Sequence, residues 1–148
     1  MECNINLRHR QVLPPDDSVY CVLCEGNPES ASHLFIQCSF AMEEWNGVLR
    51  WLEVSMELPI NMFLLWEEWN VAAGSNKIRK GFRLIWHAEV WNLWRVRNDR
   101  IFKNAVCRVE DTVEAVKVMS WRWFLSHLKV PACLFYEWSW NPKACLLR

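Results

Sequence analysis

The spacing of apolar residues changes near residue 39. Residues 1–38 show neither a helical nor a strand period, and the proline- and glycine-containing stretches at 12–20 and 26–28 are typical of loops and turns. Within this part, Ser30 or Ser32 is placed to cap one short helix through the stretch HLFIQ. From Ser39 onward, apolar side chains recur at helical spacing, at Met42, Trp45, Val48, Leu49 and Leu52. The pattern predicts an irregular N-terminal part followed by helices.

Three helical segments are predicted before residue 105. The first begins at Ser39 and is expected to end at Pro59, because proline interrupts helical hydrogen bonding. The second covers about residues 61–71 and stops at the stretch AAGSN. The longest opens at Ser75 and covers about residues 76–104, which would make a helix about 40 Å long.

A last helix is predicted from Asp111 to about Leu128. Asp111 and Glu114 have the spacing of a capping box, and Pro131 follows the segment. Residues 132–148 are aromatic but have no clear period, so they receive no assignment. No segment shows the alternation of a strand, and a mostly α protein is therefore expected.

Three cysteines and one histidine lie within eighteen residues of the irregular part. Their spacing is Cys-x2-Cys-x8-His-x4-Cys, formed by Cys21, Cys24, His33 and Cys38. Soft thiolates with one imidazole favour Zn²⁺, which takes four ligands in a tetrahedron. With four protein ligands no position stays open for water or substrate, so one structural Zn²⁺ is predicted. Some forty turn-rich residues bury too little core to fold alone, and the metal would supply that energy.

Two other interpretations of this cluster stay open. In the first, the four residues bind no metal and are ordinary reduced cysteines with a surface histidine. In the second, Cys21 and Cys24 form a thioredoxin-like redox pair. The redox pair is disfavoured because no strand is predicted before Cys21. A zinc deaminase requires a His-x-Glu sequence, whereas Leu34 and Phe35 follow His33.

The predicted fold class is therefore mostly α, in two parts. Residues 1–40 form a small zinc-stabilised module of irregular structure, and residues 41–148 form a helical, tryptophan-rich extension that contains the long basic helix. Neither a signal peptide nor a run of about 18 apolar residues is present, so an intracellular protein without a membrane span is expected. The remaining cysteines, at positions 3, 107, 133 and 145, show no pattern of a disulfide framework.

The net charge is zero but the charges are segregated. Residues 41–68 contain six glutamates and one arginine, whereas residues 77–108 contain nine Lys or Arg and two acidic residues. Cations among aromatic residues can bind phosphates while the rings stack on unpaired bases. The alternative is a helix whose cations keep its outer side soluble. The candidate nucleic-acid contacts are Lys77, Arg79, Lys80, Arg83, Arg95, Arg100 and Lys103.

Arg97 differs from the other cations of the long helix. At 100° per residue it falls inside the apolar arc that contains Trp86 and Trp94, which are themselves expected in the core. A buried arginine needs a partner, so Arg97 is predicted to form a structural clamp with the Trp94 ring and Asn98.

Two stretches resemble one family. The stretch NLRHRQVLPPDDSVYCVLCEGNPESASHLFIQCSFAMEEW, residues 6–45, resembles the reverse-transcriptase zinc-binding domain of plant LINE-type (non-LTR) retroelements. The later stretch IWHAEVWNLWRVRNDRIFKN, residues 85–104, resembles the W..W..RN...F segment that commonly follows this domain. The resemblance implies Zn²⁺ ligation by Cys21, Cys24, His33 and Cys38 and contact with template RNA or DNA. The chain departs from the family in having a shorter lead before its NL.RR-like sequence.

Three hypotheses for function follow. The first is a non-catalytic zinc module derived from a retroelement that binds RNA or single-stranded DNA. The second is an assembly module that contacts other parts of a retroelement polyprotein or a second copy. The third is a retroelement remnant without a present function. An enzyme is not expected, since the predicted zinc site is closed and no nucleophile–base or carboxylate pair stands out.

Overall fold

The computed structural model describes residues 20–127 and 133–148. Helices are its regular elements, and no strand occurs in these two ranges, which confirms the mostly α prediction. The order along the chain is η1 (His33–Gln37), α2 (Ser39–Trp51), α3 (Met62–Ala72), α4 (Asn76–Lys103), α5 (Val109–His127), α6 (Phe135–Trp140) and α7 (Pro142–Leu147). The predicted loop at residues 12–20 and the predicted helix end at Leu128 fall wholly or largely outside the described residues.

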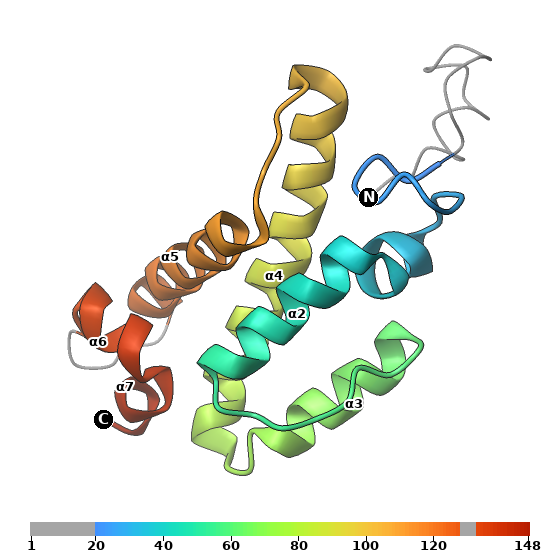
Figure 1. The fold of residues 1–148 in the computed structure, drawn as a ribbon. Coiled ribbons are helices and arrows are strands. Elements are labelled where there is room, and N and C mark those ends of the chain that lie inside the picture. Colours follow the sequence, from blue (N-terminus) through green and yellow to red (C-terminus); the bar gives the residue numbers. More distant parts are fainter. Residues whose placement is uncertain (1–19, 128–132) are drawn as a thin grey trace.

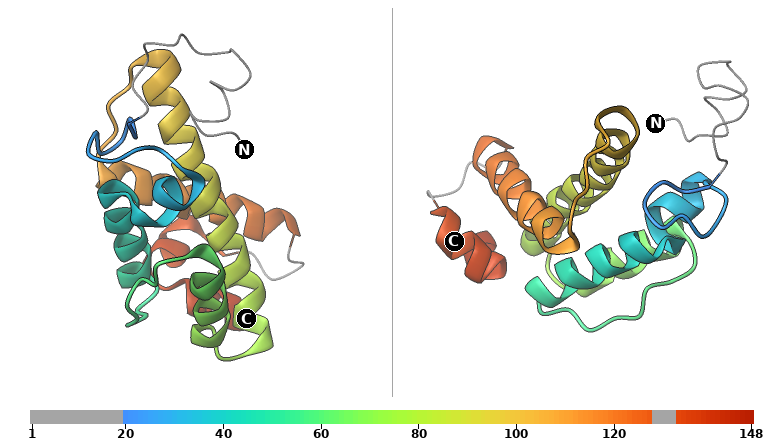
Figure 2. Two further views of the ribbon diagram at one scale, coloured as in Figure 1. Left: turned by 90° about the vertical axis from the view of Figure 1, so that its right-hand side faces the viewer. Right: turned by 45° about the horizontal axis from the view of Figure 1, so that its top comes forward.

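The long helix α4 is the axis of the fold. Figure 1 shows it running through the molecule, with α5, α6 and α7 on one side and α3 on the other, and Figure 2 shows α2 beside it in two further views. Both ends of α4 have polar caps. The Ser75 hydroxyl accepts a hydrogen bond from the Ile78 N–H, and Asn104 ends the helix in the left-handed conformation.

Two helix boundaries differ from the prediction, and one unassigned stretch is helical. Helix α2 ends at Trp51 rather than near Pro59, and Glu53 takes a positive φ of 50° just beyond it. Helix α5 begins at Val109, so Asp111 lies in its first turn and is not its N-cap. Its negative charge still favours a helix N-terminus there. The unassigned tail forms α6 and α7, each of six residues and therefore too short for periodicity to detect.

Tryptophan rings from three helices form the centre of the core. The Trp45 and Trp86 ring centroids lie 4.9 Å apart, and both rings contact Trp69. The indole N–H of Trp69 donates to the Phe82 carbonyl at 2.8 Å, which satisfies a buried donor. In the same N-terminal part of α4, a side chain at Gly81 would meet Leu146, so glycine permits α7 to approach α4 closely. Trp86 is buried as predicted, whereas Trp94 is half-buried.

Two glutamates are buried where α2 faces α4. Glu44 and Glu89 are both fully buried, and the Asn92 amide donates to Glu44 Oε1 at 2.8 Å. Within the described ranges, neither oxygen of Glu89 has a hydrogen-bond partner. Burial raises the pKa of Glu44 to about 7, against the hydrogen bond from Asn92 and the attraction of Arg95. Burial, together with the neighbouring Glu44, raises the pKa of Glu89 well above its usual range.

Stability is therefore expected to fall as the pH rises. When the pKa of a carboxyl is higher in the folded than in the unfolded chain, protonation of that carboxyl favours the folded state. The folded state therefore has its full stability below pH 4.5 and loses this contribution as the pH rises through the folded-state pKa. For Glu44 alone, the rise from 4.5 to about 7 corresponds to roughly 3 kcal/mol.

The test compares urea unfolding of wild type and Glu89→Gln at pH 5 and pH 8. The variant removes one buried charge, so it is expected to be more stable than wild type at pH 8 and close to it at pH 5. Glu43→Gln, at the exposed neighbour of Glu44, is the control and should match wild type at both values. Parallel pH profiles for Glu89→Gln and wild type would show that Glu89 is not held in its neutral form.

Candidate metal centre

Local turns bring the first two cysteines of the cluster together. The Cys21 N–H donates to the Asn27 carbonyl and the Glu25 N–H to the Cys21 carbonyl, both at 2.8 Å. Glu25 takes the left-handed conformation, with φ of 57°, which lets the chain turn back toward Pro28. This tight turn places the Cys21 and Cys24 thiols on the same side of the segment.

The other two residues of the cluster come from η1 and the start of α2. Ser30 Oγ accepts a hydrogen bond from the His33 N–H at 3.1 Å, so the predicted capping falls to Ser30, while Ser32 makes no side-chain cap. η1 is a single wide turn in which the Cys38 N–H donates to the His33 carbonyl at 2.7 Å. Cys38 then becomes the N-cap residue of α2, and its thiol faces the two from the turn.

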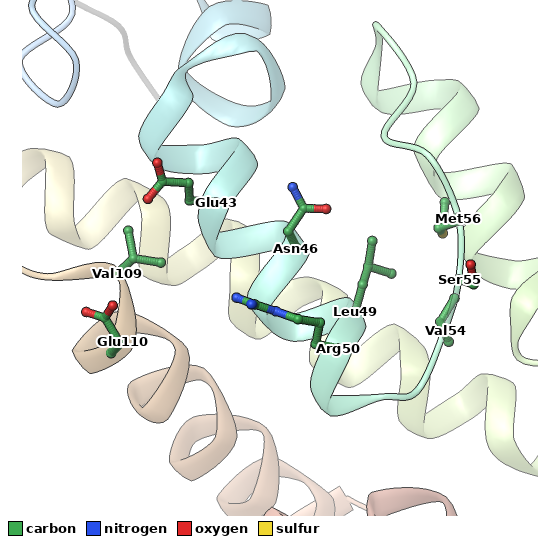
Figure 3. Close-up of a pocket in the computed structure, with 9 residues that line it drawn as sticks. All are labelled: Glu43, Asn46, Leu49, Arg50, Val54, Ser55, Met56, Val109 and Glu110. Atoms are coloured by element: carbon green, nitrogen blue, oxygen red, sulfur yellow. The ribbon is translucent and has the colours of Figure 1, made fainter.

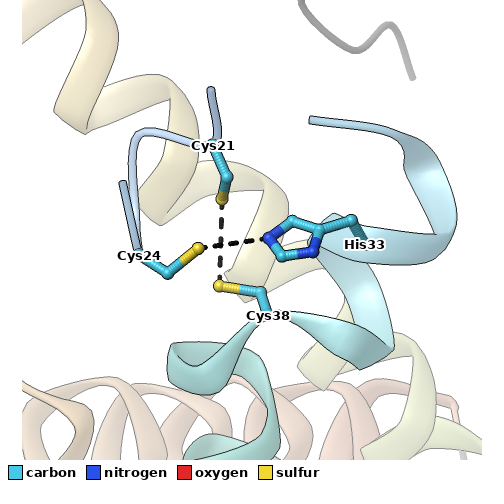
Figure 4. Close-up of side chains that lie close together, drawn as sticks. All are labelled: Cys21, Cys24, His33 and Cys38. Carbon is cyan, nitrogen blue, oxygen red and sulfur yellow. Dashed lines mark hydrogen bonds between the residues drawn. The ribbon is translucent and has the colours of Figure 1, made fainter. Parts of the chain in front are cut away.

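The four candidate ligand atoms form a compact group. All lie within 4.8 Å of one another. The Cys21 and Cys38 sulfurs are 3.8 Å apart, and Cys24 Sγ lies 3.2 Å from His33 Nε2. In Figure 4 the lines joining these two pairs cross, as opposite edges of a tetrahedron do. A tetrahedral site with metal–sulfur bonds of about 2.3 Å has sulfur–sulfur edges of about 3.8 Å. The group can therefore hold one metal ion.

The protonation chemistry of the group suits metal binding. Burial lowers the pKa of His33, which favours the neutral imidazole that coordinates metals. The hydrogen bond between Cys21 and Cys38 lowers the pKa of Cys38 and, with burial, raises that of Cys21. Cys21 is the donor and Cys38 the acceptor of this hydrogen bond. Neither Cys21 nor Cys24 is part of a disulfide, although both are close enough to share an ion.

The Arg97 side chain of α4 is bonded to the segment that carries the cluster. Arg97 is fully buried and pairs with the equally buried Glu29, with Nη2 2.7 Å from Oε1 and Nε 3.3 Å from Oε2. Its Nη1 donates to Asn98 Oδ1 at 3.0 Å, and the guanidinium lies 5.2 Å from the Trp94 ring centroid. The structure thus brings Trp94, Arg97 and Asn98 together as expected. The sequence did not indicate Glu29, which joins the segment between the two ligand pairs to α4.

The seven candidate nucleic-acid residues separate into two groups. Near the C-terminal end of α4, Arg100 Nη2 lies 3.6 Å from Glu25 Oε1, and Lys103 Nζ lies 2.6 Å from Asp99 Oδ1. These two cations therefore already have carboxylate partners. Among the described residues, the other five have no carboxylate within salt-bridge distance; they are Lys77, Arg79, Lys80, Arg83 and Arg95. Arg79 is half-buried and donates to the Asn70 carbonyl, whereas the other four are exposed.

The structure also joins two cysteines that the sequence pattern did not relate. Cys133 and Cys145 form a disulfide between the start of the C-terminal segment and α7. Their twelve-residue separation lies in a stretch without periodicity, so no sequence signal connected the two positions. Cys107 remains a free thiol outside the metal cluster.

One hollow on the surface lies away from this cluster. It measures about 560 Å³ and is lined by residues of α2, of the segment after it and of the start of α5, including Glu43, Arg50 and Glu110 (Figure 3). Its nine lining residues include neither cysteine nor histidine. The metal cluster therefore does not open into this hollow.

The chain matches no protein-family model, no curated protein and no solved structure in the comparisons made. No helix in the described ranges is long and apolar enough to cross a membrane.

Proposed function

We propose that this chain is a non-catalytic, zinc-bound helical module that binds RNA or single-stranded DNA along the exposed side of α4. Three thiolates and one imidazole form a donor set that prefers Zn²⁺ to oxygen-preferring cations. With four protein ligands the Zn²⁺ is structural. The resemblance of residues 6–45 and 85–104 to the zinc-binding domain of plant LINE-type reverse transcriptases supports the same proposal, including an origin in a retroelement polyprotein.

The observation that carries the nucleic-acid part is the composition of one side of α4. We call this side the α4 outer face; its exposed members are Lys77, Lys80, Arg83, His87, Trp91 and Arg95. Four are cations without carboxylate partners among the described residues, and Trp91 is 48% exposed between them. Cations that can neutralise phosphates, interleaved with an aromatic ring on which bases can stack, suit a single-stranded ligand.

An assembly role is the second candidate, and α3 is the observation that favours it. Phe63, Ile60 and Val71 are each at least 70% exposed on or beside this helix. Exposed apolar groups of this kind mark protein contacts when they form a continuous patch. Self-association of the protein without nucleic acid would support this candidate over the first.

The double variant Lys80→Glu/Arg83→Glu tests the nucleic-acid proposal. Fluorescence anisotropy with a labelled single-stranded oligonucleotide is expected to show strong binding by wild type at low salt and weak binding by the variant. The plot of log affinity against log salt should flatten by about 0.7 for each phosphate that the variant no longer neutralises.

Arg122→Glu is the matched control, since Arg122 is exposed on α5 and lies outside the α4 outer face. It should retain wild-type affinity apart from a small general effect of charge. If wild type does not bind at low salt, or if Arg122→Glu weakens binding as much as the double variant, the proposed function is wrong.

A further inference from the structure

A second aromatic surface lies outside the α4 outer face, at the C-terminal helix pair. A cavity of about 470 Å³ opens between α6 and α7 and is lined by Tyr136, Glu137, Trp140, Asn141, Ala144, Cys145 and Arg148. Its volume lies within the range of about 300–1,000 Å³ that is usual for small-molecule sites. Figure 1 shows α6 and α7 as two short helices packed beside each other below α5.

The two rings that line this cavity are exposed to an unusual degree. Trp140 is 87% exposed and Tyr136 is 70% exposed, whereas Trp138 between them is fully buried. Tyr136 and Trp140 are four residues apart, so they lie on the same side of α6. Two neighbouring rings with open faces form a surface on which a planar group can stack.

The helices that carry these rings are fixed in position. The Asn141 side chain accepts a hydrogen bond from the Ala144 N–H at 3.0 Å, which sets the turn from α6 into α7. The Cys133–Cys145 disulfide ties the segment before α6 to α7, and Cys145 itself lines the cavity. A cavity that is already formed loses less conformational entropy when it binds a ligand.

Cations connect this cavity to the α4 outer face. Lys77, the first member of that face, donates from Nζ to the Leu147 carbonyl at 2.8 Å, so its charge lies beside α7. The Arg148 guanidinium lines the cavity and pairs with Glu137, with Nη1 3.2 Å from Oε2. The carboxylate that lines the cavity, Glu137, is paired with Arg148. A polyanion bound along α4 could therefore extend into the aromatic cavity without meeting an unpaired negative charge of its lining.

We propose that this cavity holds one unpaired base of a nucleic-acid strand whose phosphates lie along the α4 outer face. The proposal rests on the proposed function and adds a base-stacking site to it. The adjoining cations favour this occupant over an apolar peptide, because an apolar peptide has no negative charge to pair with Lys77. Every base can stack on the rings of Tyr136 and Trp140, so the site is expected to add affinity without strong sequence preference.

The test uses the full chain loaded with zinc and a labelled twelve-nucleotide strand of deoxythymidine. Trp140→Ala is expected to weaken binding roughly ten-fold, which is within the range for loss of one stacked base. The slope of log affinity against log salt should not change, since every phosphate contact remains. Trp140→Phe keeps a ring and should restore most of the affinity. A strand in which abasic sites replace all the bases should bind wild type and Trp140→Ala equally.

Phe63→Ala is the matched control, because Phe63 is a similarly exposed ring on α3. It should bind like wild type, and the melting temperatures of all three variants should stay near that of wild type. If Trp140→Ala keeps full affinity while Lys80→Glu/Arg83→Glu loses it, the base site is wrong and the proposed function stands. If neither variant loses affinity, both proposals fail. If Trp140→Ala changes only self-association, the cavity is an interface between copies and the base site is wrong.

Discussion

Replacing Cys24 by serine is expected to abolish binding of the proposed zinc ion and to unfold the segment from Tyr20 to Cys38. Serine does not supply a thiolate, and the three ligands that remain cannot close the tetrahedron. In zinc-finger peptides the metal contributes on the order of 10–16 kcal/mol of apparent binding energy, and this energy is also folding energy. The segment has little regular structure of its own, since it contains one five-residue turn of helix.

The destabilisation should spread beyond the four ligands. Leu34, Phe35 and Ile36 are buried in the same core cluster as the tryptophans of α2 and α4. The Trp45 indole N–H donates to the Phe35 carbonyl at 2.8 Å. The melting temperature of the whole protein should therefore fall, and hydrogen exchange should become fast in residues 20–38.

Cys107→Ser is the matched control for this experiment. Cys107 is also a free cysteine, but it lies outside the metal cluster. This variant should keep its zinc and its slow exchange. If Cys24→Ser retained a wild-type melting curve, the metal would not be what holds this segment in place.

Arg97→Met is expected to cost about 3–5 kcal/mol of unfolding free energy, because it leaves the Glu29 carboxylate buried without its arginine. Urea unfolding of the zinc-loaded protein measures this cost. The double variant Glu29→Met/Arg97→Met should recover part of it, since it removes both buried charges together. Arg122→Met, at an exposed arginine of α5, is the control and should change stability by less than about 0.5 kcal/mol.

The double-variant cycle separates two explanations. A large cost for Arg97→Met with partial recovery in the double variant would show that the buried charge pair fastens residues 20–38 to α4. An equal cost in the single and double variants would show that Arg97 acts through its packing against Trp94 and not through Glu29.

Local signals explain what the sequence could predict of this fold. Asn76–Lys103 follows from helical spacing that continues for more than seven turns and from Ser75, whose hydroxyl caps the helix. The four candidate ligands are recognised from spacing alone, because the turn and the short helix that bring them together are local. The position of Arg97 inside the apolar arc similarly predicts its burial and its contacts with Trp94 and Asn98.

Tertiary contacts account for what the sequence did not reveal. Glu29 pairs with Arg97 across sixty-eight residues, and no local pattern relates the two. The burial of Glu44 and Glu89 is also hidden, since each glutamate looks like an ordinary helix-surface residue until α2 and α4 pack. Helices α6 and α7 are too short for a period to appear, and their position depends on a disulfide and on the close approach at Gly81. The aromatic cavity between them could therefore not be predicted.

The contacts suggest how the proposed zinc serves the proposed binding surface. The ligand segment touches α4 through the Glu29–Arg97 pair and touches α2 through Trp45, so it holds the C-terminal half of α4 against the core. The cations without carboxylate partners lie mainly in the N-terminal half of the same helix. We infer that residues 20–38 fix the C-terminal half of α4, whereas the N-terminal half is exposed to bind the proposed nucleic acid.

X-ray absorption spectroscopy of the purified, chelator-free protein tests the central claim most directly. Together with metal analysis, it should show one zinc per chain, coordinated by three sulfurs at about 2.3 Å and one nitrogen at about 2.0 Å. Absence of bound zinc, or zinc coordinated mainly by oxygen, would contradict the claim.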